Sequence, residues 1–328
     1  MKIVAGLGSV DEYIPYVLAG ADELFCGYVP YNWTKKYGTV LPLNRREVLA
    51  YNVQLGSFSE LEILSAMIRK YRKPVHIAMN SLYYIPEQYE EIADIVKQCM
   101  KIGFDSFILA DPALILYLRQ KGISCKIHLS GEAGEMNREA IKVFREMGIG
   151  RIIFHRKNTV ASMRQMIEAV NTERLEFEAF ALNELCQFTG AFCNSLHCDE
   201  MGYLCRTTYW GDAEMEERME RVIKRTLEIE EQQEQQEQQY LCGKSGCALC
   251  ALPQLEAAGI THLKLVGRGN YVEDMIRDIR NLKAALGVLE ENQREEKETG
   301  RYIDQLNKKI FDGQPCGNNC IYTSGQFL

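Results

Sequence analysis

The chain has 328 residues, of which 46% are hydrophobic and 25% are charged, proportions typical of a soluble globular protein. These values exclude a mainly disordered or fibrous protein. No apolar run reaches the roughly 18 residues of a membrane helix, and the start MKIVAGLGSVDEY lacks a signal-peptide core, so we expect a cytoplasmic protein without a membrane partner. The net charge of −7 does not indicate RNA binding, although a local basic groove stays compatible with it.

The cysteines are unusually many and unevenly spread. Nine of the twelve lie at or after Cys186, and in a reducing compartment such a cluster indicates metal ligation or redox chemistry before disulfides. The charge is uneven as well. Asp212–Gln239 holds ten acidic and four basic residues, a net charge of −6, so the acidity belongs to one insertion rather than to the fold.

Eight short β-branched runs alternate with helical patterns along the chain. The predicted strands are Lys2–Leu7, Asp22–Tyr28, Pro74–Asn80, Asp105–Asp111, Lys126–Ser130, Arg151–His155, Leu175–Ala181 and His262–Val266. Strands that alternate with helices predict a parallel sheet covered by helices, and eight of them predict a closed (β/α)8 TIM-like barrel. The alternative is an open doubly wound sheet, but no GxGxxG motif follows the first strand.

The helices between the strands show a 3.6-residue period. The predicted segments are Pro86–Ile102, Arg138–Met147, Val160–Val170 and Val272–Leu289, and a capping box at Ser59–Glu62 opens a helix to about Lys70. Gly103, Gly122 and Gly148 mark helix ends.

The domain organisation is predicted in four parts. Residues 1–181 hold barrel strands one to seven, 182–261 form a cysteine-rich insert with an acidic helix, 262–289 supply strand eight and the last helix, and 290–328 form a charged, exposed helical tail with Cys316 and Cys320. The stretch Glu230–Gln239 is interpreted as a solvated helix extension or linker, with a partner-binding arm as the alternative.

In such a barrel the active site lies at the C-terminal ends of the strands. The polar residues expected there are Cys26, Asn80, Asp111, His128, Ser130, Glu132, Arg156, Glu178, Lys264 and Arg268. Buried polar groups are costly unless they bind something, and carboxylates among two arginines and a lysine are typical of an anionic substrate or of acid/base chemistry. Each residue taken alone is as easily explained as a capping or ion-paired group.

Cysteines from both sides of the insert should converge on one rim of this barrel: Cys186, Cys193 and Cys205 after strand seven, and the pair Cys247 and Cys250 before strand eight. Four thiolates can hold a [4Fe–4S] cluster or a tetrahedral zinc ion. Free thiols are the alternative, and this is the expectation for Cys26, Cys99 and Cys125, which lie in apolar patterns. The chain has no HExxH or GxSxG motif, so it lacks two familiar hydrolase signatures.

Two stretches of the chain resemble the conserved blocks of peptidase family U32, the collagenase-like peptidases. The first is Glu178-x-Phe180-x4-Leu185-Cys186-x6-Cys193, and the second runs from Cys247-x4-Leu252-Pro253 through Leu263–Arg268 to Tyr271-Val272. Asn80-Ser81-Leu82 and His128-x-Ser130 fall where the family has similar pieces, so the resemblance covers roughly residues 1–290.

The resemblance implies a [4Fe–4S] protein, because several members of the family carry out oxygen-independent hydroxylation of a quinone precursor, transfer RNA or ribosomal RNA. The implied cluster ligands are Cys186, Cys193, Cys205 and Cys247, with Cys250 as a substitute for the last. Cys198, Cys242, Cys316 and Cys320 are additional and could serve a second metal or a partner. Departures from the family pattern at Asn183, Glu184, Ala191, Glu132 and Val266 alter the pocket lining and leave the substrate open.

Three functions follow as hypotheses. In the first, an iron–sulfur enzyme binds an anionic small molecule or a macromolecule through Asn80, Ser130, Arg156, Lys264 and Arg268, while Glu178, Glu132 or His128 moves protons. The second is a peptidase, which could use a metal or acid/base set of His128, His155 and Glu178. The third is a cluster-carrying subunit that docks on a homologous protein through the acidic arm and the Cys316/Cys320 tail.

Overall fold

The computed structural model describes residues 1–38, 41–45, 53–170, 175–183, 186, 240–294, 299–313, 316 and 319–322. Much of the predicted cysteine-rich insert, including Cys193, Cys198, Cys205 and the acidic Asp212–Gln239 segment, lies outside these residues.

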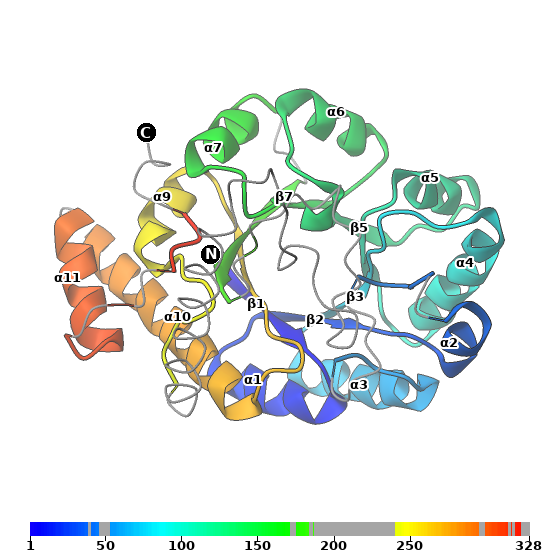
Figure 1. Cartoon of the computed structure of the whole chain (residues 1–328), viewed down its shortest axis with the longest axis horizontal. Helices are drawn as coiled ribbons and strands as arrows, with labels where there is room; N and C mark the ends of the chain where they lie inside the picture. Colours follow the sequence, from blue (N-terminus) through cyan, green and yellow to red (C-terminus); the bar gives the residue numbers. More distant parts are fainter. Residues whose placement is uncertain are drawn as a thin grey trace, which may run out of the picture.

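Eight parallel strands close into a barrel in chain order, and β8 returns to pair with β1 (Figure 1). The strands are β1 (Lys2–Leu7), β2 (Glu23–Gly27), β3 (Val75–Met79), β4 (Ser106–Leu109), β5 (Lys126–Leu129), β6 (Arg151–Ile153), β7 (Glu176–Leu182) and β8 (His262–Leu265). The predicted (β/α)8 fold and all eight predicted strands are confirmed.

Helices surround the barrel on the outside (Figure 1). They are α1 (Tyr13–Ala19), α2 (Tyr31–Tyr37), α3 (Phe58–Tyr71), α4 (Pro86–Lys101), α5 (Pro112–Gln120), α6 (Arg138–Glu146), α7 (Val160–Glu168), α9 (Leu252–Ala257), α10 (Val272–Arg294) and α11 (Thr299–Ile310), with short 3₁₀ helices η1 (Val10–Glu12), η2 (Gly131–Ala133) and η6 (Leu249–Ala251). Gly103, Gly122 and Gly148 have φ of 107°, 70° and 77°, which confirms them as left-handed helix ends. Within the described residues, no helix is long and apolar enough to span a membrane.

Two predictions about helices need correction. The capping box of α3 is formed by Ser57 and Glu60, because the Ser57 side chain accepts a hydrogen bond from Glu60 N and Glu60 reaches back to Ser57 N. It does not begin at Ser59. The tail helix α11 is also not simply exposed, because Tyr302 and Leu306 are buried against the core.

The three cysteines predicted to lie in the core do so. Cys26, Cys99 and Cys125 are buried, and burial raises the pKa of each thiol, to about 12 for Cys26 and Cys99. They are inert packing residues and leave nine cysteines for other roles.

Candidate functional site

A buried network of charged residues fills the N-terminal end of the barrel. Arg151 donates from Nη2 to Glu23 Oε2 (2.8 Å) and Glu176 Oε2 (2.7 Å). His76 and His262 each lie within hydrogen-bond distance of Glu23, at 2.9 and 3.2 Å. Since these side chains come from the first or second positions of their strands, the network closes the bottom of the barrel rather than its mouth.

Glu178 and Lys264 form the next layer, two residues further along β7 and β8. Lys264 Nζ donates to Glu178 Oε1 (2.9 Å), and Arg151 Nη1 donates to Glu178 Oε2 (3.0 Å). Burial alone would raise the pKa of Glu178, but Lys264 and Arg151 outweigh it and hold that pKa below its usual value. The carboxylate is therefore ionised and shared between two cations.

A second polar network lies at the C-terminal ends of the strands. Ser130 Oγ accepts hydrogen bonds from Asn80 Nδ2 (3.3 Å) and Glu132 N (3.2 Å). The Glu132 carboxylate is 3.4 Å from Arg45 Nε and 3.7 Å from Arg156 Nη1. We call Arg45, Asn80, Ser130, Glu132 and Arg156 the rim network; it joins the chain after α2 to the ends of β3, β5 and β6.

Three cations near the two networks lie over the faces of two phenylalanine rings. Lys264 Nζ lies 3.7 Å from the centroid of the Phe25 ring, and Arg156 Cζ lies 3.8 Å from that of Phe180. Arg268 also lies over Phe25, at 5.8 Å, and packs so closely on β2 that a Cβ at Gly27 would lie 2.7 Å from its Nη1. Buried cations packed on aromatic rings therefore lie at and just below the C-terminal end of the barrel.

The histidines predicted as catalytic or metal-binding have different described partners. The ring of His128 packs against that of His76, with centroids 4.5 Å apart, and burial lowers the pKa of His128 well below its usual value. His155 Nδ1 is 3.5 Å from Glu135. Neither histidine hydrogen-bonds Glu178, whose partners among the described residues are Arg151 and Lys264. The described contacts do not join the set His128, His155 and Glu178.

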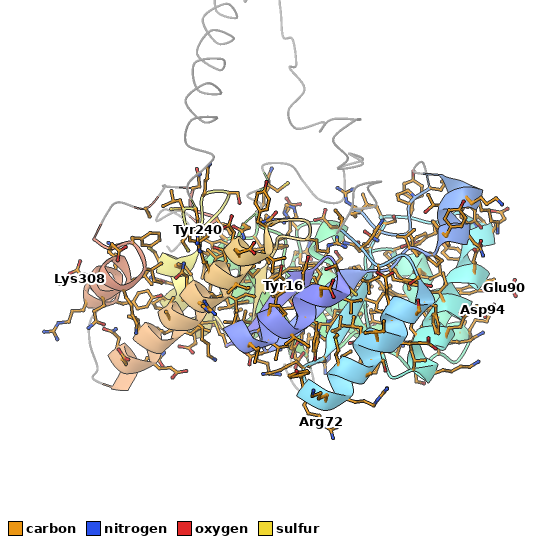
Figure 2. All side chains as sticks on the ribbon, turned by 90° about the horizontal axis from the view of Figure 1, so that it is seen from below. Tyr16, Arg72, Glu90, Asp94, Tyr240 and Lys308 are labelled. Carbon is orange, nitrogen blue, oxygen red and sulfur yellow. The ribbon has the colours of Figure 1, made fainter. Side chains whose placement is uncertain are left out.

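Asn183 connects the two cysteine-bearing loops. It adopts a left-handed conformation (φ 68°) directly after β7, and its N donates to Gly246 O (2.8 Å). Its Nδ2 donates to Asp278 Oδ2 (2.8 Å) and Val266 O (3.1 Å). Tyr240 OH also donates to Asp278 (2.7 Å) and lies at the end of the barrel opposite Arg72 (Figure 2). This brace of Asn183, Asp278 and Tyr240 fixes the end of β7 and the start of the segment after Tyr240 to α10 at the mouth.

The described cysteines outside the core fall into two places. Cys186 lies near Arg156, the guanidinium whose pKa is lowered by burial and raised in turn by Glu132. Cys247 and Cys250 lie together. Burial raises the pKa of both thiols, and the nearby Cys316 raises it further. Among the described residues, no three His, Cys, Asp or Glu side chains already surround one point as metal ligands do. The expected quartet of Cys186, Cys193, Cys205 and Cys247 stays a prediction, because two of its members lie outside the described residues.

The structure brings most of the predicted site residues into the two networks. Asn80, Ser130, Glu132 and Arg156 meet in the rim network, Arg268 lies beside it over Phe25, and Lys264 and Glu178 pair beneath. Asp111 instead caps α5, where it accepts a hydrogen bond from Ala113 N (2.8 Å). Their assigned roles in binding and proton transfer remain predictions.

Sequence reasoning missed Arg45, Arg151 and the residues around Arg151. Arg45 belongs to no strand or motif, so no pattern indicated it. The Arg151 network did leave a signal: Glu23, Ser106, Arg151, Glu176 and His262 are the first residues of five strands. A polar residue recurring at the start of parallel strands predicts a polar layer inside the barrel.

The curated relatives that match this chain are all named tRNA hydroxylation proteins. The chain is 22% identical over 214 residues to tRNA hydroxylation protein P1 of Bacillus subtilis (strain 168), covering 64% of this chain and 46% of that protein. It is 25% identical over 174 residues to tRNA hydroxylation protein P of Escherichia coli (strain K12), covering 53% of this chain and 34% of that one. For the protein P of Haemophilus influenzae (strain ATCC 51907 / DSM 11121 / KW20 / Rd) the identity is 30% over 195 residues, with 58% and 38% covered. The chain thus spans less than half the length of these relatives.

Among solved structures, the U32 peptidase Mk0906 matches with a TM-score of 0.42 and 15% identity, over 55% of this chain and 69% of that one. Dihydrodipicolinate synthase from Bacillus clausii matches with a TM-score of 0.44 and 10% identity, over 95% and 83% of the two chains. The sequence profile described as "Peptidase family U32" matches residues 8–318, nearly the whole chain. On that match, the chain belongs to peptidase family U32.

Proposed function

We propose that this chain is an enzyme that hydroxylates a nucleoside of tRNA without using O₂, and that it works with a [4Fe–4S] cluster. The oxygen would come from a hydroxyl-donating co-substrate that is reduced by two electrons as the nucleoside is oxidised (R–H + X–OH → R–OH + X–H). The observation that carries the proposal is the coincidence of a cationic barrel mouth with a cysteine loop that begins at its edge. The names of the relatives support tRNA as the substrate class. The activity of those longer proteins is a guide to this chain, not a property taken from it.

The rim network fits a polyanionic substrate. Arg45, Arg156 and Arg268 present guanidinium groups, which bind phosphate and carboxylate oxygens through paired hydrogen bonds. Phe180 lies under Arg156 and Phe25 under Arg268, so the ring faces help to hold these guanidinium groups in place. The overall net charge of −7 does not oppose this, because most of it belongs to the Asp212–Gln239 segment.

The donor set fits an iron–sulfur cluster. Cys186, Cys193 and Cys205 would supply three thiolates, and one thiol of the loop that carries Cys242, Cys247 and Cys250 would supply the fourth. Cys186 lies near Arg156, so a cluster held there would border the rim network. Such a cluster, when bound, supplies electron transfer.

The residues of the barrel would bind and orient the substrate. Arg156, held over Phe180 and facing Glu132, would fix an anionic group, while Glu132 is the partly exposed carboxylate of the rim and the better candidate for moving a proton. Glu178 is less suited to that task, because Lys264 and Arg151 keep its pKa low and its carboxylate ionised. Its role would be to hold Lys264 in place.

The experiment is to express the chain in a bacterial strain that lacks its own tRNA hydroxylation and to analyse total tRNA nucleosides by mass spectrometry. We expect one nucleoside with an added oxygen, lost in Cys186→Ser and retained in Cys198→Ser, the insert cysteine without an assigned role. If the added oxygen is absent with abundant folded protein, or if it persists in Cys186→Ser, the proposed function is wrong.

A further inference from the structure

The C-terminal tail lies directly on the loop that carries Cys247 and Cys250. Cys247 pairs with Cys320 in an isolated parallel bridge, in which Cys247 N donates to Asn319 O (2.8 Å) and Ile321 N donates to Cys247 O (2.8 Å). The Asn319 side chain also donates to Lys244 O. In Figure 1 the red tail runs beside the yellow segment that leads into α9. Residues more than sixty positions apart in the chain are thus held side by side.

Buried side chains anchor this contact on both sides. In the tail, Ile321 and Tyr322 are 4% and 3% exposed. Behind the loop, Tyr302 of α11 is buried and its OH donates to Leu249 O (2.7 Å), within the turn between Cys247 and Cys250. The tail is therefore a packed part of the fold, and its two cysteines have a fixed place beside the loop.

This contact unites two pairs of thiols. Cys247 and Cys250 are separated by two residues, and Cys316 and Cys320 by three. The one geometric link between the two pairs is the backbone bridge of Cys247 with Cys320, and Cys316 is near enough to Cys247, Cys250 and Cys320 to interact with them electrostatically. In the described residues the four side chains do not yet surround one point, which means that a metal would have to draw them together.

We propose that Cys247, Cys250, Cys316 and Cys320 form a second centre, a tetrathiolate site for a structural Zn²⁺ ion. Structural zinc is held by four thiolates in closed tetrahedral geometry, and its ligands come in pairs separated by two to four residues. Both pairs have that spacing, and the backbone bridge holds one pair beside the other. Closure of thiols onto the ion is expected, since zinc binding in such sites is coupled to folding.

The two centres need different thiols, so the second proposal does not rest on the first. A cysteine bound to zinc in this site is not available to the cluster, and the assignment takes Cys247 and Cys250 out of the cluster. Cys242, buried on the same loop near Asp278, then becomes the available fourth cluster ligand. The loop would give Cys242 to the cluster, and Cys247 and Cys250 to the zinc site that it shares with the tail.

The test is the metal content of the full chain, purified without oxygen from medium containing zinc and iron. We expect about one zinc per chain in the wild type and in Cys198→Ser, and at least a fivefold lower zinc content in the double variant Cys316→Ser/Cys320→Ser. The iron content should be the same in all three. Zinc without iron would refute the proposed cluster and leave this site standing.

Three results would overturn the zinc site: no zinc in the wild type, unchanged zinc in the double variant, or loss of iron instead of zinc from it. If the double variant does not fold, the wild-type chain loaded with Co²⁺ decides. A tetrathiolate centre gives intense tetrahedral d–d bands and thiolate charge-transfer bands in the visible and near-ultraviolet. Their absence from a folded, cobalt-treated chain also rejects the site.

Discussion

The exposure and ion pairing of single side chains in this barrel depend on their neighbours in the fold. Glu178 and Glu132 are both carboxylates near the barrel axis, yet Glu178 is 1% exposed between two cations and Glu132 faces the rim with a side chain 19% exposed. The sequence placed both at the mouth as equal candidates. It could not separate them, because the separation depends on Arg151, which reaches Glu178 from β6.

The buried histidines predict how stability depends on pH. Burial lowers the pKa of His76, His128 and His155 in the folded chain, so below about pH 6.5 the unfolded chain binds protons that the folded chain does not. Each of them therefore removes stability as the pH falls, and for His128, whose pKa is lowered well below its usual value, the loss is up to about 1.4 kcal/mol per pH unit. His128→Gln should lower this slope by about one histidine between pH 6.5 and 5, measured by urea unfolding. Equal slopes in the two proteins would contradict the assignment of a neutral, buried His128.

A substitution of Arg156 tests how much the rim network contributes to substrate binding. Arg156→Gln removes a cation that lies over Phe180 and faces Glu132, and it should weaken the binding of unmodified tRNA by roughly 10- to 100-fold, the effect of losing a charged hydrogen bond. Lys308→Gln on α11, away from the mouth, is the charge-matched control and should change the dissociation constant little (Figure 2). Equal effects of the two variants would mean that tRNA is bound by general charge rather than at the rim.

At the scale of elements, periodicity was enough to predict the barrel. The strands are short apolar runs, several of them preceded by a helix-ending glycine, and their order around the barrel is their order along the chain. The capping of α3 and the burial of α11 were not predictable in this way. Ser57 and Ser59 offer the same cap chemistry two residues apart, and α11 is buried only because Tyr302 meets η6, a contact between distant parts of the chain.

The brace between β7 and α10 makes a prediction at this scale. Asp278→Ala leaves Tyr240 and Asn183 without an acceptor that both use, at 2.7 and 2.8 Å, and should cost about 1–3 kcal/mol of unfolding free energy. The control is Asp274→Ala, one turn earlier on α10, where the carboxylate is 39% exposed and 3.8 Å from Arg277; its cost should stay within about 0.5 kcal/mol. Chemical denaturation measures both, and similar costs would show that the brace is not important.

At the scale of the whole molecule, the two ends of the barrel differ, and the predicted site residues gather at the C-terminal end. The N-terminal end is closed by the Arg151 network, while the opposite end carries the rim network and the loops with Cys186 and Cys247. The uneven distribution of cysteines predicted a metal centre near strands seven and eight. It did not predict that the tail returns to that place, because only the folded chain puts Cys320 beside Cys247.

The most direct test of the central proposal is the iron and acid-labile sulfide content of the full chain purified without oxygen. A [4Fe–4S] enzyme should contain about four iron and four sulfide per chain, with both lost in Cys186→Ser and kept in Cys198→Ser. Iron below about one per chain after anaerobic reconstitution, in protein that is folded, would show that the thiols at the barrel mouth hold no such cluster.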